Sequence, residues 1–313
     1  MITDYPVKGF PMKFSWQEGK WEELFNEQIN FIKEDVRRAK VQGRLVIYLS
    51  CPISSRGGGY SGTNVEITEY TRMKLLKEWG LGFWILNPAN YQMESKGGTG
   101  LLHMHARKLW GNKGEEILKQ LIKESPPKDG DYMRMWTKVL VEDEDKLNLG
   151  YNIDGFYFLA PSDVRAYFLG SDNGDLTASI QNYFSRKYDL DSDFRDFFTV
   201  KGIGWGKEYD ASGAPKPGEH TEEELRLIKI WDRKRLDFFR FYSLKASMNY
   251  SPGGHDEWNI WYLLNELRIK KADGDIKAGR KAGIGELIPA YFDTKQVTPA
   301  DFVTRGYSGY EQM

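Results

Sequence analysis

The sequence predicts an α/β protein with a Rossmann-like, doubly wound parallel sheet and an irregular insertion. Two short apolar runs, 44–50 and 83–86, have the composition of strands buried on both faces, which is typical of parallel sheets. A glycine-rich loop and a segment of helical length separate them. The order strand, loop, helix, strand is that in which a doubly wound sheet begins.

The spacing of apolar residues predicts the individual elements. Within 21–36, Phe25, Ile29, Ile32 and Val36 recur at helical spacing, which indicates an amphipathic helix. A capping-box pattern over 221–224 opens a later long helix. The expected elements after the first helix are a strand over 44–50, a helix over 63–79, a strand over 83–86, one or two helices within 97–131, a helix over about 131–140, a strand over 154–160, helices over 221–247 and 258–267, and a strand over 288–292.

We expect one domain over residues 1–313, with a helical N-terminal extension over 1–43 and an insertion over about 161–220. The insertion is expected to be irregular because it is rich in glycine, with a small hairpin around 197–203. A break over 251–257 is expected to separate the last two helices.

Composition excludes several classes of protein. Lys plus Arg is 44 and Asp plus Glu is 45, so the formal net charge of −1 lacks the basic excess usual in duplex nucleic-acid binders. No apolar run approaches the roughly 18 residues of a membrane span, and no signal peptide is evident. The single cysteine, Cys51, fits a reducing compartment. We therefore expect a cytoplasmic protein that binds a small molecule and contacts neither membrane nor duplex nucleic acid.

The segment Ser251-Pro252-Gly253-Gly254-His255-Asp256-Glu257 precedes an apolar helix. A glycine-permitted turn at a helix N-terminus exposes main-chain N–H groups that can bind an anion. Glu257 is expected in the first turn, near that anion. The alternative is ordinary helix capping, since acidic residues are common in first turns.

A second candidate segment runs from Tyr48 to Gly58 and follows the first predicted strand. Open α/β sheets bind ligands at the carboxyl ends of their strands, which is where Arg56, Gly57 and Gly58 are expected. Arg56 could pair with a phosphate while the glycines allow close approach of the backbone. The Gly-Lys-Ser/Thr ending of a phosphate-binding P-loop is missing, so an ATPase is rejected. A plain flexible loop is the alternative.

In this order, the two segments resemble the nucleoside 2-deoxyribosyltransferase-like superfamily. The Ser-Pro-Gly-x-His-x-Glu spelling from Ser251 to Glu257 is most similar to the nucleotide N-glycosidase branch, especially cytidine 5′-monophosphate hydrolases. Asp131-Tyr132-Met133-Arg134 resembles a Tyr-Met-Arg helix of small phage and bacterial relatives. The likeness covers about 44–87, 130–160 and 249–267.

The resemblance implies a function and a site. Glu257 would attack C1′ of the sugar of a nucleoside 5′-monophosphate, and Tyr48 would orient it. No cofactor or metal would be needed, because carboxyl groups can supply both nucleophile and acid. The implied substrate-binding and phosphate-binding residues are Arg56, Gly57, Gly58, Ser251, Gly253, Gly254 and His255.

One position departs from the family pattern. The acid that protonates the leaving base lies four residues after the tyrosine in relatives with the Tyr-Met-Arg helix, and here that residue is Trp136. Asp131 or Asp256 would have to replace it. A (deoxy)ribosyltransferase and a nucleotide-sensing module without catalysis stay open as alternatives. The resemblance also implies a homo-oligomer, most simply a dimer.

Overall fold

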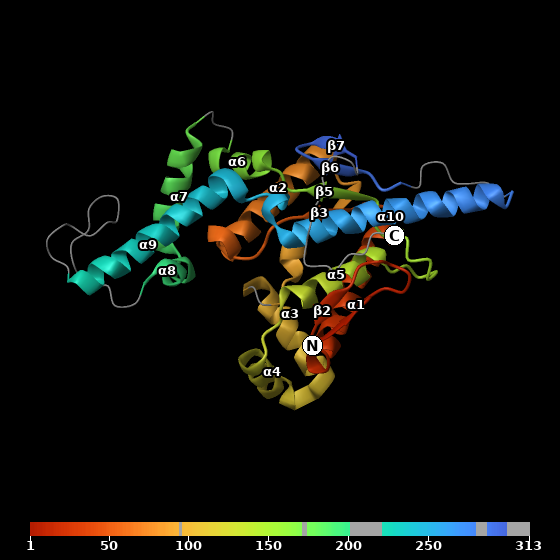
Figure 1. Cartoon of the computed structure of the whole chain (residues 1–313), viewed down its shortest axis with the longest axis horizontal. Helices are drawn as coiled ribbons and strands as arrows, with labels where there is room; N and C mark the ends of the chain where they lie inside the picture. The colour runs from red at the N-terminus through yellow and green to blue at the C-terminus, as the bar shows by residue number, and fades with distance from the viewer. Residues whose placement is uncertain (94–95, 171–173, 201–220, 280–286, 299–313) are drawn as a thin grey trace. The chain divides into compact units, whose positions relative to one another are not determined.

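The computed structural model describes residues 1–93, 96–170, 174–200, 221–279 and 287–298, with the backbone alone for 96–99 (Figure 1). Its chain divides into two compact units, where a single domain was expected. Unit 1 consists of 1–52, 68–160 and the chain from Ser247 onward, and unit 2 consists of 53–67 and 161–246. The predicted insertion therefore forms most of unit 2.

Unit 1 contains a five-stranded sheet, which confirms an α/β fold with a mostly parallel sheet. The strands lie in the order β4 (Phe83–Leu86), β3 (Leu45–Ser50), β5 (Gly155–Phe158), β6 (Ala290–Phe292), β7 (Lys295–Val297). Strand β3 pairs in parallel with both β4 and β5, β5 pairs in parallel with β6, and only β7 is antiparallel to its neighbour. Since the chain passes from β3 to β4 and then to β5 on the other side of β3, the strand order reverses between β3 and β5. This order is consistent with a Rossmann-like arrangement.

The central strand β3 is buried on both faces. Tyr48 packs in the cluster formed by helices α1 (Lys20–Val41), α5 (Asp129–Val141) and α10 (Pro252–Lys277). Ile47 and Leu49 point the other way, toward Leu75 of helix α2 (Ser61–Trp79). This alternation is the period of two expected along a strand.

Unit 1 contains further elements outside the five-stranded sheet and its covering helices. They are the antiparallel pair β1 (Ile2–Asp4) and β2 (Phe14–Trp16), the 3-10 turns η2 (Pro88–Tyr91), η3 (Gly111–Lys113) and η5 (Met248–Tyr250), and helices α3 (Lys96–Trp110) and α4 (Gly114–Glu124). The N-terminal segment 1–43, expected to be helical, thus contains a strand pair as well.

Helix α10 begins earlier than the sequence suggested. The break predicted over 251–257 is wrong, because Ser251 is the N-cap and the helix runs from Pro252. The Ser251 hydroxyl accepts a hydrogen bond from the main-chain N–H of Gly254 at 3.1 Å, and proline is favoured in a first turn. Glu257 is therefore six residues beyond the cap, in the second helical turn and not the first.

Unit 2 is helical. It contains η1 (Arg56–Gly58), the first turns of α2, α6 (Pro161–Leu169), α7 (Leu176–Leu190), α8 (Ser192–Phe198), α9 (Glu222–Arg240) and the π-helical turn η4 (Phe241–Lys245). The prediction of an irregular insertion is wrong over 161–198, where three helices form. Much of the glycine that suggested irregularity falls in 201–220, outside the described residues, as does the second half of the expected hairpin; Phe197 and Phe198 end α8.

The helices of unit 2 pack around a core of aromatic side chains. Phe184, Phe194, Phe198 and Phe238 are all buried, and neighbouring rings meet edge to face, for example Phe184 and Phe198 with centroids 4.9 Å apart. Aromatic pairs of this geometry stabilise beyond their buried area. Much of the aromatic surplus of the chain is thus used in this core.

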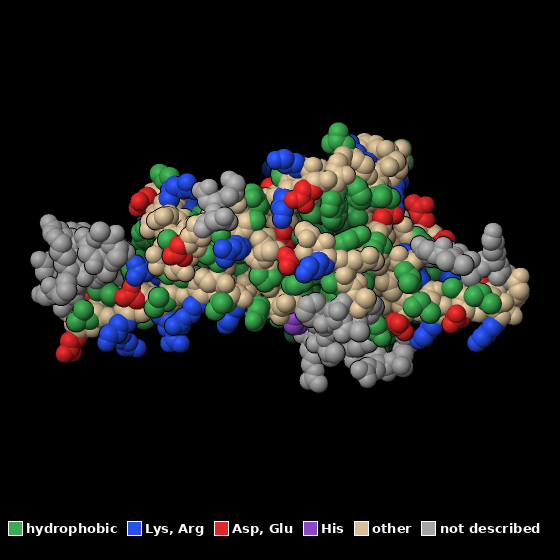
Figure 2. All heavy atoms as spheres, turned by 90° about the horizontal axis from the view of Figure 1, so that it is seen from above, with side chains coloured by type: hydrophobic (Ala, Val, Ile, Leu, Met, Phe, Trp, Pro, Cys, Tyr) green, Lys and Arg blue, Asp and Glu red, His purple; other side chains and the backbone are tan. Residues whose placement is uncertain are grey.

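The surface shows both signs of charge. Figure 2 shows acidic and basic side chains interspersed over the visible face, in agreement with the near balance of 44 cationic and 45 anionic residues. Within the part of the chain that the structure describes, no helix combines the length and apolar character needed to cross a bilayer.

Candidate functional site

A buried carboxylate is held at the carboxyl end of β3. Tyr48 and Ser50 are two residues apart on this strand, so both side chains lie on the same face. The Tyr48 hydroxyl donates a hydrogen bond to Oε1 of Glu257 at 2.6 Å, and the Ser50 hydroxyl donates to Oε2. Both oxygens of one carboxylate are therefore held by hydroxyl groups from a single strand.

Packing and main-chain hydrogen bonds place Glu257 against this strand. Trp258 and Trp261 of α10 are buried, and the Trp258 ring lies 4.8 Å from that of Phe158 at the end of β5. The N–H of Leu159 donates to the main-chain oxygen of Ser50, and the N–H of Met248 donates to that of Leu159, at 2.9 and 3.0 Å. The start of α10 is thereby connected to the end of the sheet where β3 and β5 adjoin.

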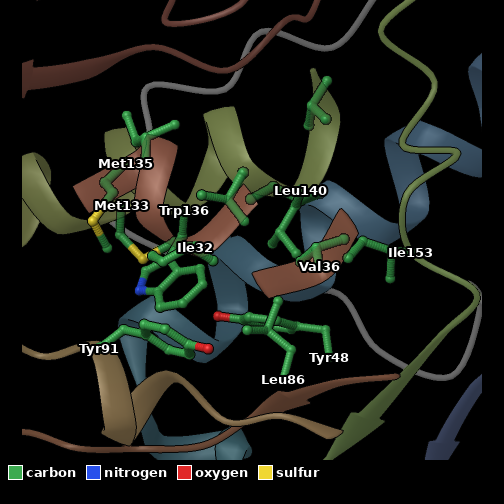
Figure 3. Packing of buried hydrophobic residues seen from close by; sticks show 14 of the residues in the cluster. Ile32, Val36, Tyr48, Leu86, Tyr91, Met133, Met135, Trp136, Leu140 and Ile153 are labelled. Carbon is green, nitrogen blue, oxygen red and sulfur yellow. The ribbon is translucent and has the colours of Figure 1, made fainter. Parts of the chain in front are cut away.

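Aromatic rings fix Tyr48. Its ring centroid lies 5.4 Å from that of Trp136 and 5.5 Å from that of Phe156. Figure 3 shows Trp136 and Tyr91 beside Tyr48, with Leu86 in the same cluster. Trp136, where the family resemblance expects an acid, thus packs against the tyrosine that binds Glu257.

The surroundings of Glu257 favour its neutral form. The pKa of Glu257 is raised from an ordinary 4.5 to about 7, chiefly by burial. The hydrogen bonds from Ser50 and Tyr48 oppose this rise, and the charge of Asp256 adds to it. Burial and the nearby Glu257 charge raise the pKa of Tyr48 well above its usual value, so Tyr48 stays protonated and donates. A carboxyl group with this pKa exchanges its proton near neutral pH, as catalytic carboxyls do.

Of the two aspartates considered as acid, Asp131 has a structural role. It is buried near the start of α5, where its carboxylate accepts hydrogen bonds from the main-chain N–H groups of Gln17 and Lys128 at 2.6 and 2.8 Å, and from the Gln17 amide at 3.1 Å. A carboxylate that accepts three such bonds caps its helix, and its role as the acid stays a prediction. Asp256 is fully buried and adjoins Glu257 in α10.

The residues from Ser251 to His255 form the start of α10. The N–H of Gly254 is directed at the Ser251 hydroxyl, and the N–H of His255 donates to the Ser251 carbonyl at 2.9 Å. The His255 ring Nε2 lies 2.9 Å from the main-chain oxygen of Asn249. Gly253 occupies the second position of the helix. These contacts are those of a helix cap, and anion binding here stays a prediction.

Arg56, Gly57 and Gly58 lie in unit 2, in the turn η1. Gly57 and Gly58 have φ angles of 70° and 104°, which side-chain-bearing residues rarely adopt. A Cβ on Gly58 would come within 2.4 Å of the main-chain oxygen of Asp237, so glycine is required for the approach of this turn to α9. Ser251 belongs to unit 1 and Arg56 to unit 2, so a phosphate site formed by both residues stays a prediction.

Ser50 is the site residue that the sequence analysis missed. It lies within the predicted strand and the candidate segment from Tyr48 to Gly58, but no role was assigned to it. The signal was present, because alternation along a strand places residue i+2 on the face of residue i. If Tyr48 binds the Glu257 carboxylate, the Ser50 hydroxyl, two residues later on the same face, is expected to lie near the same carboxylate.

A metal centre has no support in the described residues. Within these ranges no group of three or more His, Cys, Asp or Glu side chains is arranged to hold a metal ion. Cys51 is buried, and burial raises the pKa of its thiol, which disfavours the thiolate that metals and nucleophilic chemistry require.

Comparisons of the chain with protein-family models, with curated proteins and with solved structures give no match. Any function is therefore argued from the sequence and from the geometry of the Tyr48–Ser50–Glu257 site.

The raised pKa of Glu257 predicts a pH-dependent stability. The folded protein retains this proton up to about pH 7 whereas the unfolded chain loses it near 4.5, so stability falls as pH rises between these values. We expect Glu257→Gln to remove this loss, since a buried neutral amide does not titrate. Between pH 5 and 8, denaturant titrations should show wild type losing about 2–3 kcal/mol more than the variant. If the free energy of unfolding changed with pH in the same way in both proteins, the raised pKa of Glu257 would be contradicted.

The structural role of Asp131 predicts a different outcome. Asp131→Ala removes acceptors from Gln17 and Lys128 and should lower the free energy of unfolding by about 1–3 kcal/mol, as loss of buried hydrogen bonds does. Any pH dependence that arises from Glu257 should be unchanged. Thermal denaturation and a repeat of the pH series check both; a variant as stable as wild type would refute the capping role.

Proposed function

We propose that the protein is a hydrolase that cleaves the N-glycosidic bond of a nucleoside 5′-monophosphate, with Glu257 as nucleophile. One observation supports this most: a buried glutamate, held at both oxygens, lies where the strand order reverses between β3 and β5. In a Rossmann-like sheet, the carboxyl ends of the strands at this point are the usual place for a ligand. The family resemblance supplies the nucleotide as substrate.

The proposed reaction has two steps. The Glu257 carboxylate forms a bond to C1′ as the bond from C1′ to the base nitrogen breaks, and the base leaves with that electron pair and accepts a proton. Water then attacks C1′ as the bond from C1′ to the Glu257 oxygen breaks, and its proton passes to the group that had protonated the base. This step releases the (deoxy)ribose 5-phosphate and restores the carboxylate. A pKa of about 7 leaves much of Glu257 ionised at neutral pH. Asp131 and Asp256 stay the two candidates for the group that supplies the proton to the leaving base.

The 5′-phosphate part of the proposal rests on the sequence motifs. Arg56 supplies a guanidinium suited to a phosphate, and Ser251 with the turn at Gly253 lies at a helix N-terminus. We also propose that the protein is cytoplasmic, on the basis of its composition. We propose that it forms a homo-oligomer, on the basis of the same family resemblance.

The test is incubation with a panel of nucleoside 5′-monophosphates, measuring free base and sugar phosphate by chromatography. We expect wild type to release base, and Glu257→Gln to retain nucleotide binding while losing at least about 10³-fold in turnover. Thr137→Val, which removes a buried hydroxyl bonded to the main chain of Met133, is a matched control that should keep its activity. Base exchange without net loss of nucleotide would favour the transferase. Saturable binding without turnover in wild type would favour the sensing module.

A separate prediction concerns the phosphate. Arg56→Ala should raise KM for the nucleotide about tenfold or more, because a charge-assisted hydrogen bond to phosphate is lost, and should change KM for the matching nucleoside little. Steady-state kinetics with both substrates measure this. Equal effects on nucleotide and nucleoside would remove Arg56 from the phosphate site.

A further inference from the structure

The Glu257 carboxylate accepts hydrogen bonds from two hydroxyl groups, and the second of them, from Ser50, restricts its orientation. A carboxylate held at one oxygen can still rotate about its Cγ–Cδ bond. With the Tyr48 hydroxyl on Oε1 and the Ser50 hydroxyl on Oε2, the plane of the group is defined. A nucleophile gains rate when its attacking oxygen is already oriented.

We propose that Ser50 is a positioning residue that orients the Glu257 carboxylate and determines the pH at which it becomes an effective nucleophile. This inference deepens the proposed function and rests on it for its kinetic part. It assigns to Ser50 a contact separate from that of Tyr48, because the two hydroxyls donate to different oxygens of the carboxylate.

The surroundings of Ser50 suit such a role. Its side chain is fully buried, so water does not compete for its hydroxyl. Its main chain is fixed by the pairing of Ser50 with Phe158 in the sheet and by the hydrogen bond from Leu159 to its carbonyl. Ser50 is the last residue of β3, nearer than Tyr48 to the edge at which a ligand is expected.

Opposing effects act on Glu257 from each element packed around it. Burial and the neighbouring charge of Asp256 in α10 favour the protonated carboxyl, and the Tyr48 and Ser50 hydroxyls on β3 favour the carboxylate. Cys51, directly after β3, couples electrostatically to Glu257, but its raised thiol pKa keeps it neutral. Loss of either hydroxyl should therefore make Glu257 more basic.

This gives Ser50→Ala a pH signature. A hydrogen bond to a charged group is worth enough that its loss should move the titration of Glu257 upward by about one pH unit or more. Loss of orientation should lower kcat/KM at every pH, and the upward shift should add a further loss of about tenfold at pH 6 that disappears by pH 9. A merely structural role would lower activity equally at every pH.

The experiment titrates Glu257 without substrate. Proteins labelled with ¹³C at the glutamate carboxyl are followed by NMR from pH 5 to 9, with the Glu257 signal identified by its loss in Glu257→Gln. We expect an upward shift of the midpoint in Ser50→Ala and in the near-isosteric Ser50→Cys, return toward wild type in Ser50→Thr, and no shift in Thr137→Val. The Cys variant serves where the Ala variant does not fold.

The outcomes separate the two proposals. An unshifted midpoint in Ser50→Ala and Ser50→Cys, or activity lost equally at all pH values, overturns the role of Ser50. A shifted midpoint in a protein whose wild type cleaves no nucleotide keeps the control of Glu257 by Ser50 and overturns the glycosidase function instead.

Discussion

Burial of β3 on both faces is the constraint on which the site depends. A strand that is covered by α2 on one side and by α1, α5 and α10 on the other cannot leave a polar side chain unsatisfied without a large energetic penalty. Tyr48 and Ser50 both point to the second face, and both hydroxyls bind the one carboxylate that α10 brings there. The same alternation that builds the core thus supplies the two donors for Glu257.

The helix start at Ser251 completes this arrangement. Capping by the Ser251 hydroxyl determines where α10 begins, and Glu257 then faces β3 from the second turn. The residues that resembled an anion-binding loop are the same residues that cap the helix. This helix start offers fewer N–H donors to an anion than an ordinary one, because Pro252 has none and the N–H groups of Ser251 and Gly254 donate to the Met248 carbonyl and the Ser251 hydroxyl.

The sequence was sufficient for strands β3, β4, β5 and β6 and for most helices of unit 1, because their apolar spacing is strong and local, whereas the three-residue strands β1, β2 and β7 were not predicted. The pairing of Tyr48 with Glu257 came from the resemblance, and the structure places them in contact. The role of Asp131 was not predictable, because it depends on Gln17, which lies 114 residues away in the chain. Helix α9 was predicted from its capping box, but helices α6, α7 and α8 were missed for a similar reason. Glycine content is a local signal, whereas Phe184, Phe194 and Phe238 stabilise the helices of unit 2 through contacts between different helices.

The buried Glu257 also bears on how this sequence can change. A carboxyl group whose pKa is near 7 destabilises the fold at neutral pH, by a few kcal/mol out of the roughly 5–15 kcal/mol that hold a typical domain together. Glutamine has a similar volume and does not titrate, so it would avoid this loss of stability at the same position. The free energy of unfolding at neutral pH is therefore lower with the glutamate than it would be with an equally well packed glutamine.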